Sequence, residues 1–407
     1  MYIKTFQNPQ FHMLFNSLQK LIFVLVVLFL LCYPLEMSKF ILKEINNADY
    51  VKELENIGFD VSYRHKAKEK FVYKNLKIYG LTVPQANILK QIALTLGSDC
   101  AVHREVITGK VDTSDVILGG SFSQLRKIAE KLKFQPFSLK ELSNEILAQL
   151  ETKHHKTKLV GILNITNNSF SDGGEYLEVE KAQAHFNQLV QDGADVVDIG
   201  AESTKLNAEP ISPEIQLKRL LPLINGKSII SIDTRSSIVA EECLKKGAKI
   251  INDVSGLKYD SNMAETIAKY NATVVIQHSL YRQNRGSNVE PYDKLIDEVY
   301  LDLYKQTEYA KSMGINNIII DVGIGYDKTL EDNFRLFNRI DEFKSMGYPI
   351  MLGISRKSLL QLENNEEKDI FTVALNTIAI QKEIDYLRVH NVNLHRKLID
   401  IYLKDLL

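Results

Sequence analysis

The chain has 407 residues, of which 45% are hydrophobic, and a formal net charge of -1 at pH 7. These values are typical of globular proteins with a large core, and the length allows more than one domain. The near-zero charge argues against a dedicated nucleic-acid-binding protein. The three cysteines, Cys32, Cys100 and Cys243, form no CxxC pair. We therefore expect reduced thiols in a cytoplasmic protein, with neither a zinc site nor a disulfide framework.

Residues 1–36 form a hydrophobic N-terminal segment. Its centre, residues 21–33, is continuously apolar, but it is shorter than the roughly 20 residues that a membrane-spanning helix needs. The length suits a signal-peptide core or a marginal anchor, although no A-x-A cleavage site follows. A third interpretation is that Met37 is the real start, because an ordinary soluble sequence begins there. All three remain open, and membrane association is the less favoured expectation.

Residues 38–150 are expected to form a small α/β domain of unknown role. Residues 84–96 have apolar side chains at helical spacing, with Pro84 in the first turn. Residues 101–107 and 115–120 are interpreted as strands. Ser121 is suited to cap a helix that runs to Lys133. The region contains no glycine-rich phosphate loop and no metal-spaced His/Cys set, and it leads through a charged helix into a linker.

From Leu159 onward, short apolar runs recur, and nearly all of them end in a charged or amide residue. We expect β-strands in eight places: 159–164, 195–204, 228–235, 249–256, 273–279, 318–325, 349–358 and 386–392. Helical patterns between and after them cover 179–193, 236–247, 263–270, 292–313, 330–346, 368–384 and 392–406. Such alternation predicts a (β/α)8 TIM barrel over residues 158–407, preceded by the small α/β domain. An open doubly wound sheet is the alternative.

The active site of such a barrel lies at the carboxyl ends of its strands. The acids expected there are Asp198, Glu202, Asp233, Asp253 and Asp321, the amides are Asn164 and Asn252, and the cationic or potentially cationic side chains are Arg356, Lys357, Arg388 and His390. The set suits a substrate with a polar heterocycle and a phosphate end. Asn164 is an oxygen ligand that could hold Mg²⁺ against a diphosphate. Any single acid could merely cap a helix, but the whole set is improbable as caps.

The chain resembles the dihydropteroate synthase family over about residues 158–407. The motifs that carry the resemblance stand in family order: GILNIT, SFSDGG, DIGAEST, SIDT, INDVSG, DVGIGYDK, GISRKS and RVHNV. The resemblance implies a (β/α)8 barrel that condenses 4-aminobenzoate with a dihydropterin methyl diphosphate. The products would be dihydropteroate and diphosphate, in folate synthesis. Members are commonly dimers through the last barrel helices, so the resemblance also implies a homodimer.

The resemblance implies roles for individual residues. The pterin-binding positions are Asp233, Asn252, Asp321 and Lys357. Arg388 and His390 match the diphosphate-binding pair, with Asn164 at the Mg²⁺ position. The 4-aminobenzoate side comprises Thr204, Lys205, Ser355, Arg356 and Phe170. Asp172, on the mobile first loop with Phe170, and Lys357 are the implied catalytic residues.

The chain departs from the family pattern at several loops. Asn167-Asn168 replace Pro-Asp in the first loop, and Lys205-Leu206 replace Arg-Pro in the second. Gln277 stands where the fifth strand usually has Met, and Asn391 where the last motif has Asp. The anchors for pterin and phosphate are intact, so the alterations concern chiefly the second substrate.

The sequence therefore predicts a dihydropteroate synthase with pterin diphosphate and 4-aminobenzoate as small-molecule partners and no nucleic-acid partner. Two alternatives differ in chemistry. One is another pterin-binding barrel enzyme, such as a methyltransferase, although a methyl donor lacks the diphosphate that Lys357, Arg388 and His390 would serve. The other is a weakly active pterin-binding protein. Diphosphate release with and without 4-aminobenzoate distinguishes all three.

Overall fold

The computed structural model describes residues 43, 45, 50–151, 156–165, 175–202, 211–226, 228–279, 292–357, 359 and 361–404. The chain divides into two compact units, Met1–Leu150 and Glu151–Leu407. The predicted hydrophobic segment 1–36 lies outside the described residues. Among the helices of the described part, none is long and apolar enough to cross a membrane.

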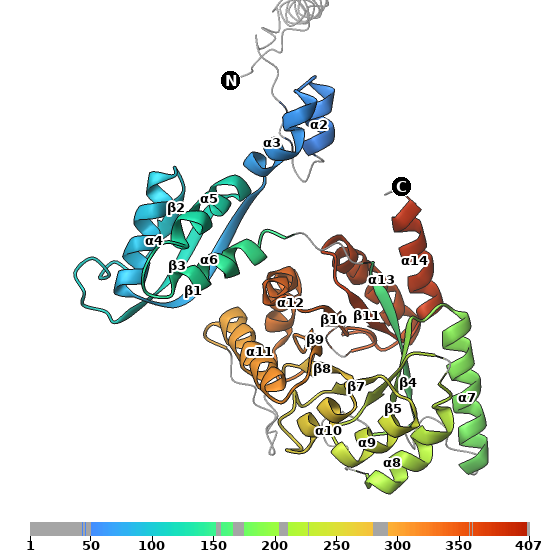
Figure 1. Cartoon of the computed structure of the whole chain (residues 1–407). Coiled ribbons are helices and arrows are strands. Elements are labelled where there is room, and N and C mark those ends of the chain that lie inside the picture. The colour runs from blue at the N-terminus through green and yellow to red at the C-terminus, as the bar shows by residue number, and fades with distance from the viewer. Residues whose placement is uncertain are drawn as a thin grey trace, which may run out of the picture. The chain divides into compact units, whose positions relative to one another are not determined.

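The first unit is built on a three-stranded antiparallel sheet in the order β1-β3-β2. Its strands are β1 (Tyr73–Thr82), β2 (Asp99–Ala101) and β3 (Thr113–Ser121). Its described helices are α2 (Tyr50–Asn56), η1 (Val61–Tyr63), α3 (Arg64–Phe71), α4 (Val83–Thr95), α5 (Phe122–Leu132) and α6 (Leu139–Ala148). The sheet and the helices α4, α5 and α6 pack around one apolar core (Figure 1).

The Ser121 prediction is confirmed. The Ser121 hydroxyl accepts from the Gln124 amide, and the Gln124 side chain accepts from the Ser121 amide, so the two form a capping box. Leu125 and Ile128 lie on the buried face of α5, which anchors the helix to the core.

Two details of this unit were predicted wrongly. The strand expected at 101–107 ends at Ala101, and residues 104–109 form turns. The His103 ring nitrogen Nδ1 accepts from the Glu105 amide at 3.2 Å, a local bond that favours the turn. Strand β1 is not among the predicted strands, although its apolar residues Leu76 and Ile78 alternate with polar Asn75 and Lys77.

The second unit is a closed barrel of eight parallel strands, which confirms the predicted (β/α)8 fold (Figure 1). The strands are β4 (Lys158–Asn164), β5 (Val196–Gly200), β6 (Ile230–Asp233), β7 (Ile250–Asp253), β8 (Thr273–Gln277), β9 (Asn317–Asp321), β10 (Ile350–Leu352) and β11 (Tyr386–Val389). The helices are α7 (Glu175–Gln191), α8 (Pro213–Leu220), η2 (Leu221–Leu223), α9 (Ser237–Lys246), α10 (Met263–Lys269), α11 (Leu295–Ser312), α12 (Leu330–Asn338), η3 (Ile340–Met346), α13 (Asn365–Gln381) and α14 (Val392–Lys404).

Several predicted boundaries were wrong. The strands are shorter than expected: the run at 195–204 is a strand only over Val196–Gly200, and the run at 349–358 only over Ile350–Leu352. In both, the described polar residues after the strand, such as Glu202 and Arg356, belong to the loop that follows it. Helix α8 was not predicted, and the helix expected at 330–346 is divided into α12 and η3.

Strand alternation places the site. Successive strand side chains point to opposite faces. Val160, Val196, Ile250, Val275, Ile319 and Met351 pack together as an apolar cluster separate from the one that includes the helices. They therefore fill the barrel interior. On each strand, the residue two positions after its member of this cluster also faces inward and lies nearer the carboxyl end of the strand.

We call the polar members of that next layer the inner layer: Asp198, Asp233, Asn252, Gln277, Asp321 and Arg388. Arg388 follows Tyr386, which packs on the interior cluster. Asp233 belongs to the layer because it pairs in register with Asn252. An apolar plug thus closes one side of the inner layer, and the mouth of the barrel lies on the other.

Candidate active site

Arg388 is the centre of an ion network in the inner layer. Its Nε donates to Asp198 Oδ2 at 2.6 Å, and its Nη2 donates to Asp233 Oδ2 at 2.8 Å. Asn252 Nδ2 donates to the same Asp198 oxygen at 3.0 Å. Four strands of the barrel therefore meet in one buried network, because these residues belong to β5, β6, β7 and β11.

Burial governs the charges of this network. It raises the pKa of Asp233 to about 7, although the positive charge of Arg388 opposes the rise. Burial also opposes the charged form of Arg388, but the carboxylates of Asp198 and Asp233 outweigh it and raise the pKa of Arg388. Arg388 therefore stays a cation.

The family resemblance implies a diphosphate role for Arg388 and a pterin role for Asp233. The structure joins the two residues directly. It also gives a part to Asp198, which was named as a mouth acid but had no substrate role. Its place in the DIGAEST motif was the available signal.

Asp321 and Lys357 lie beside this network. Asp321 Oδ1 accepts from the Gly323 amide at 2.7 Å. Burial raises the pKa of Asp321, and the charge of Lys357 opposes that rise. Lys357 Nζ donates to the Ile324 carbonyl and lies 4.5 Å from the centre of the Tyr326 ring. Burial lowers the pKa of Lys357 to about 8, against the attraction of Asp321.

Lys328 holds the loop after β9 in place, and the sequence pattern does not predict this role. Its buried Nζ contacts His278 Nδ1 at 3.0 Å and donates to the carbonyls of Gly323 at 2.9 Å and Tyr326 at 3.0 Å. Burial lowers the pKa of Lys328 to about 7. Burial, followed by the charge of Lys328, lowers the pKa of His278 to about 2, so this ring is neutral and can accept. The DVGIGYDK motif contains Lys328, but nothing in its pattern shows that the side chain turns inward.

Gly323 explains why this loop needs glycine. Its φ is +70°, and a Cβ at this position would lie 1.9 Å from the His278 carbonyl oxygen. A side chain is excluded on both grounds. The end of β8 and the loop after β9 are therefore in close backbone contact, which fixes the position of Asp321.

Ser355 and His390 belong to the outer edge of the mouth. The Ser355 hydroxyl lies 3.0 Å from His390 Nδ1 and accepts from the His390 amide at 3.2 Å. Burial, with the nearby charge of Arg356, lowers the pKa of His390 to about 3. His390 was considered potentially cationic from sequence. The structure makes it a neutral ring, which can still donate one hydrogen bond to a phosphate oxygen.

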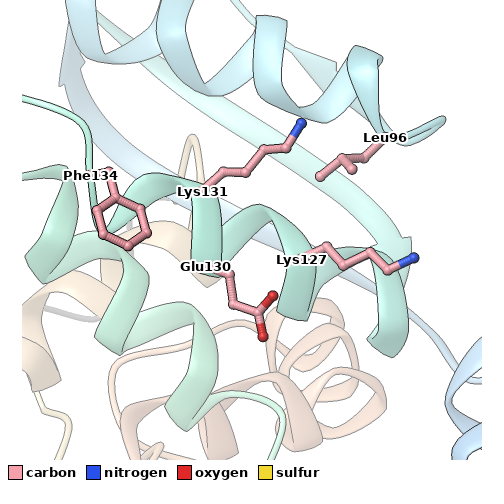
Figure 2. Close-up of a pocket in the computed structure, with 5 residues that line it drawn as sticks. All are labelled: Leu96, Lys127, Glu130, Lys131 and Phe134. Atoms are coloured by element: carbon pink, nitrogen blue, oxygen red, sulfur yellow. The ribbon is translucent and has the colours of Figure 1, made fainter.

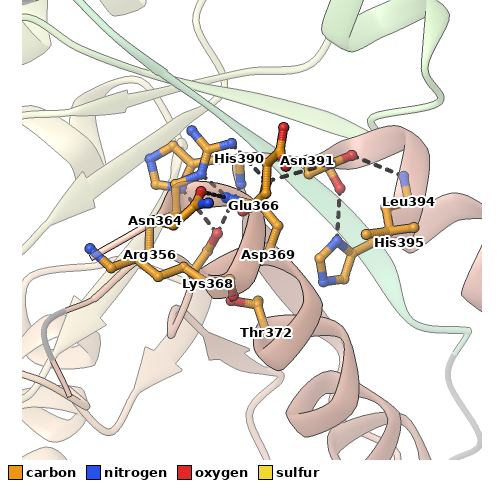
Figure 3. A network of polar contacts seen from close by, with 11 residues as sticks. Arg356, Asn364, Glu366, Lys368, Asp369, Thr372, His390, Asn391, Leu394 and His395 are labelled. Carbon is orange, nitrogen blue, oxygen red and sulfur yellow. Dashed lines mark hydrogen bonds and ion pairs between the residues drawn. The ribbon is translucent and has the colours of Figure 1, made fainter. Parts of the chain in front are cut away.

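Arg356 is held in a polar network shown in Figure 3. Its Nε and Nη2 donate to the two Asp369 oxygens at 2.9 and 2.7 Å. Asn391 Nδ2 donates to Asp369 at 3.4 Å, and the Asn391 side-chain oxygen accepts from the Leu394 amide at 3.1 Å, which caps α14. Burial alone would raise the pKa of Asp369, but the bonds from Arg356 outweigh it and lower the pKa. We call Ser355, Arg356, Asp369, His390 and Asn391 the rim network.

Asn164 ends β4, and its side chain is exposed at the mouth. A Cβ on Gly200 would lie 3.3 Å from Asn164 Oδ1 and 3.4 Å from Asp233 Cβ, so the glycine leaves room beside that oxygen. Among the described residues, no group of three or more His, Cys, Asp or Glu side chains could hold a metal ion by itself. A cation here would need further oxygens from a ligand or water. Phe170, Asp172, Thr204 and Lys205 lie outside the described residues.

The first unit has a surface hollow at the end of α4 and along α5 (Figure 2). Leu96, Lys127, Glu130, Lys131 and Phe134 line it. Lys127, Glu130, Lys131 and Phe134 are all exposed. Charged groups with shifted pKa values cluster at functional sites, so the buried charges of the barrel mouth make the better candidate active site.

The fold and the mouth define a (β/α)8 enzyme whose buried acids, amides and cations converge at the carboxyl ends of the strands. Residues 160–390 match the family model described as "Pterin binding enzyme". A curated dihydropteroate synthase from Clostridium beijerinckii is 40% identical over 248 residues, which cover 58% of this chain and 90% of that protein. The chain therefore belongs to the pterin-binding enzyme family, and within it to the dihydropteroate synthases.

Two further comparisons describe the extent of the likeness. The crystal structure of a dihydropteroate synthase from Clostridium difficile in the presence of pteroic acid has a TM-score of 0.56 and 36% identity. The match covers 62% of this chain and 99% of the Clostridium difficile chain. A probable bifunctional folylpolyglutamate synthase/dihydropteroate synthase from Haloferax volcanii is 32% identical over 341 residues. That match covers 76% of this chain, but the chain spans only 40% of that relative's length.

The Haloferax match reaches beyond the barrel. The second unit, Glu151–Leu407, makes up about 63% of the 407 residues. A match over 76% of the chain must therefore include part of the first unit. The Clostridium beijerinckii match, at 58%, can be contained in the barrel.

Proposed function

We propose that the chain condenses (7,8-dihydropterin-6-yl)methyl diphosphate with 4-aminobenzoate, giving 7,8-dihydropteroate and diphosphate. The observation that carries the proposal is the inner layer: acids, amides and an arginine at inward strand positions, closed on one side by an apolar plug. A flat polar heterocycle can insert there and exchange the network's internal bonds for bonds to itself. Membership of the family supports the same reaction.

Pterin binding is assigned to Asp233, Asn252, Asp321 and Lys357. A pterin offers a guanidine-like edge of N–H donors, which a carboxylate accepts well. Asp321 is the acid for that edge, since the Gly323 amide already fixes one of its oxygens. Lys357, with a pKa of about 8, is still largely cationic at neutral pH and can donate to a ring acceptor or balance developing charge.

Diphosphate binding is assigned to Arg388, His390 and Asn164. Arg388 supplies permanent positive charge, and neutral His390 supplies a donor. Asn164 fits Mg²⁺ as one oxygen ligand, because Gly200 leaves its amide oxygen accessible. When bound, Mg²⁺ would neutralise charge on the leaving diphosphate. The bond from the methylene carbon to the diphosphate oxygen breaks, and the electron-rich pterin stabilises the cation that remains.

The second substrate is assigned to the outer side of the mouth. Ser355 and Arg356 belong to the rim network, and Thr204, Lys205 and Phe170 are proposed to complete this side from the two loops. The amine nitrogen of 4-aminobenzoate forms the new C–N bond and then loses a proton. Because the carbon is already cationic, the amine needs little activation. Asp172 and Lys357 are the proposed catalytic residues, and loop closure would exclude water from the cation.

We also propose a cytoplasmic homodimer. In the described part of α13, Ile370, Phe371 and Ile378 are exposed, and Ile401 is exposed on α14. Apolar side chains gathered on neighbouring helices favour a protein contact. The buried free thiols of Cys100 and Cys243 suit a reducing compartment. Sedimentation should give a dimer mass, and Phe371→Glu should shift it to the monomer. A wild-type monomer would contradict the proposal.

The purified full chain tests the reaction. We expect diphosphate release from the pterin diphosphate to depend on 4-aminobenzoate and on Mg²⁺, with dihydropteroate formed in equal amount. Tight pterin binding without diphosphate release would support a pterin-binding protein instead. Methyl transfer from a methylated pterin, with no release of diphosphate, would support the other barrel enzymes.

A further inference from the structure

Gln277 is an inner-layer residue with an unused hydrogen-bonding group. It ends β8 and is only 5% exposed. Its Nε2 is buried and has no hydrogen-bond partner among the described residues. Val275, two positions earlier, belongs to the interior cluster, so Gln277 also faces the interior.

The register of the barrel places Gln277 next to the proposed pterin anchor. Gln277 pairs directly with Asp321 on β9. The Asp321 carboxylate is directed elsewhere: Oδ1 accepts from Gly323, and Oδ2 lies 3.9 Å from where a Cβ of Gly353, just after β10, would stand. The Gln277 amide is therefore adjacent to the acid without being bonded to it.

A buried amide without a partner is costly, because the group has lost its water and gained nothing in exchange. Here the apolar plug closes the interior side, so the open side is the mouth. A half-turn about the last side-chain bond exchanges the amide's nitrogen and oxygen with almost no change of shape. The donor can therefore turn toward a ligand in the mouth.

We propose that Gln277 binds the pterin ring directly and contributes to specificity for it, resting on the proposed function above. If Asp321 takes the guanidine-like edge, the ring acceptors flanking that edge lie next to Gln277: the 4-oxo oxygen on one side and the ring nitrogen N1 on the other. The amide donates to one of these acceptors on binding. Methionine at this position can contact the ring but cannot donate.

The test uses Gln277→Met in the full chain, a substitution that keeps length and volume. In calorimetry with pteroic acid, we expect affinity to fall by about 3- to 10-fold, the value of one lost hydrogen bond. Without ligand, the variant should melt about 2–4 °C higher, because the unpaired donor is gone. Binding and stability thus change in opposite directions, which a purely structural residue would not produce.

Asn376→Leu is the matched control. Asn376 on α13 also has a buried, unpartnered amide, but it lies on the helix layer. This variant should melt higher with unchanged affinity for pteroic acid. Equal affinity of wild type and Gln277→Met would overturn the inference, as would a lower melting temperature together with weaker binding. If the wild type itself binds no pteroic acid, the proposed function fails rather than the role of Gln277.

Discussion

The inner layer and the rim network hold their charges in different ways. Inner-layer side chains come from barrel strands, lie on an apolar plug and bond across several strands, as Arg388 does with Asp198 and Asp233. Rim side chains come from the loop after β10, the helix α13 and the two residues after β11, and Arg356 stays about one-third exposed beside Asp369. The inner layer is thus fixed by the barrel itself, whereas the rim depends on how loops and helices meet. We expect substitutions in the inner layer to have the larger effects.

The largest effect is expected from Arg388→Met. Removing this cation leaves Asp198 and Asp233 buried without their partner, which should lower the free energy of unfolding by about 3–5 kcal/mol at pH 7. This loss of stability in the variant should become smaller as the pH falls. The raised pKa of Asp233 means that the folded state binds a proton at a higher pH than the unfolded state does, and this proton stabilises the fold. Urea denaturation at pH 7 and pH 5.5 measures both quantities.

His390→Ala is the comparison for that experiment. It should weaken binding of the pterin diphosphate and leave pteroic acid, which lacks the diphosphate, bound nearly as before. Arg388→Met should weaken both ligands, because Arg388 also positions Asp233. If both variants spared pteroic acid, Arg388 would serve the phosphate end alone, and the difference between inner layer and rim would be smaller than the geometry indicates.

Asp321→Asn should have the next largest effect. Removing one partner of a buried charged hydrogen bond costs about 2–5 kcal/mol, so affinity for pteroic acid should fall at least tenfold. The Gly323 amide can still donate to the remaining oxygen, so the loop should keep its conformation. Calorimetry gives the affinity. An unchanged value would show that Asp321 does not face the ring.

Strand periodicity explains why the inner layer could be predicted. Short apolar runs ending in Asp, Asn or Arg fix both the strand and the inward position of its last residues, so Asp233, Asn252 and Asp321 were correctly placed at strand ends. The alternation of side chains along a strand does not show which residues of other strands they bond to. The bonds from Arg388 to Asp198 and Asp233 join residues more than 150 positions apart.

Other features depend on tertiary structure that no local pattern encodes. Lys328 is charged and lies in a loop, which predicts exposure, yet it is buried. Its Nζ contacts three groups in the segments that follow β8 and β9. Asp369 is one acid among several at the start of α13, and only the folded barrel brings it to Arg356. β1 was missed because its polar residues obscured the alternation.

The two regions share one property that pH can test. His278, near the inner layer, has a pKa of about 2, and His390, in the rim network, about 3. Both are far below the usual value of about 6.5. Between pH 6.5 and 5, each ring takes up a proton only when the chain unfolds. Each ring should therefore lower stability as the pH falls, by up to about 1.4 kcal/mol per pH unit.

Asp233 acts in the opposite sense over the same range, since its folded pKa of about 7 lies above the unfolded value. The measurement is therefore the difference between wild type and variant, from denaturation curves at pH 6.5, 5.75 and 5. His278→Gln and His390→Gln should each lose less stability on acidification than the wild type. If only His278→Gln does so, the rim is open to water and His390 titrates normally.

The smallest effect is expected from Asp369→Asn, which weakens the rim network while keeping its shape. Because Arg356 is partly exposed, the free energy of unfolding should change by less than about 1 kcal/mol. The guanidinium loses its ionised partner, so its orientation toward the outer mouth becomes less fixed. We therefore expect a several-fold higher Michaelis constant for 4-aminobenzoate and an unchanged constant for the pterin diphosphate.

Asp341→Asn provides the matched control for this last variant. It weakens the ion pair between Asp341 in η3 and Lys382, which lies outside the mouth. Both Michaelis constants should stay at their wild-type values. A change in the pterin constant for Asp369→Asn would show that the rim network supports the first substrate as well. An unchanged 4-aminobenzoate constant would remove Arg356 from the second-substrate side. Either result would show that the rim network is not specific for the second substrate. Only the inner layer, whose side chains are positioned by the barrel strands, would then keep its assignment to one substrate.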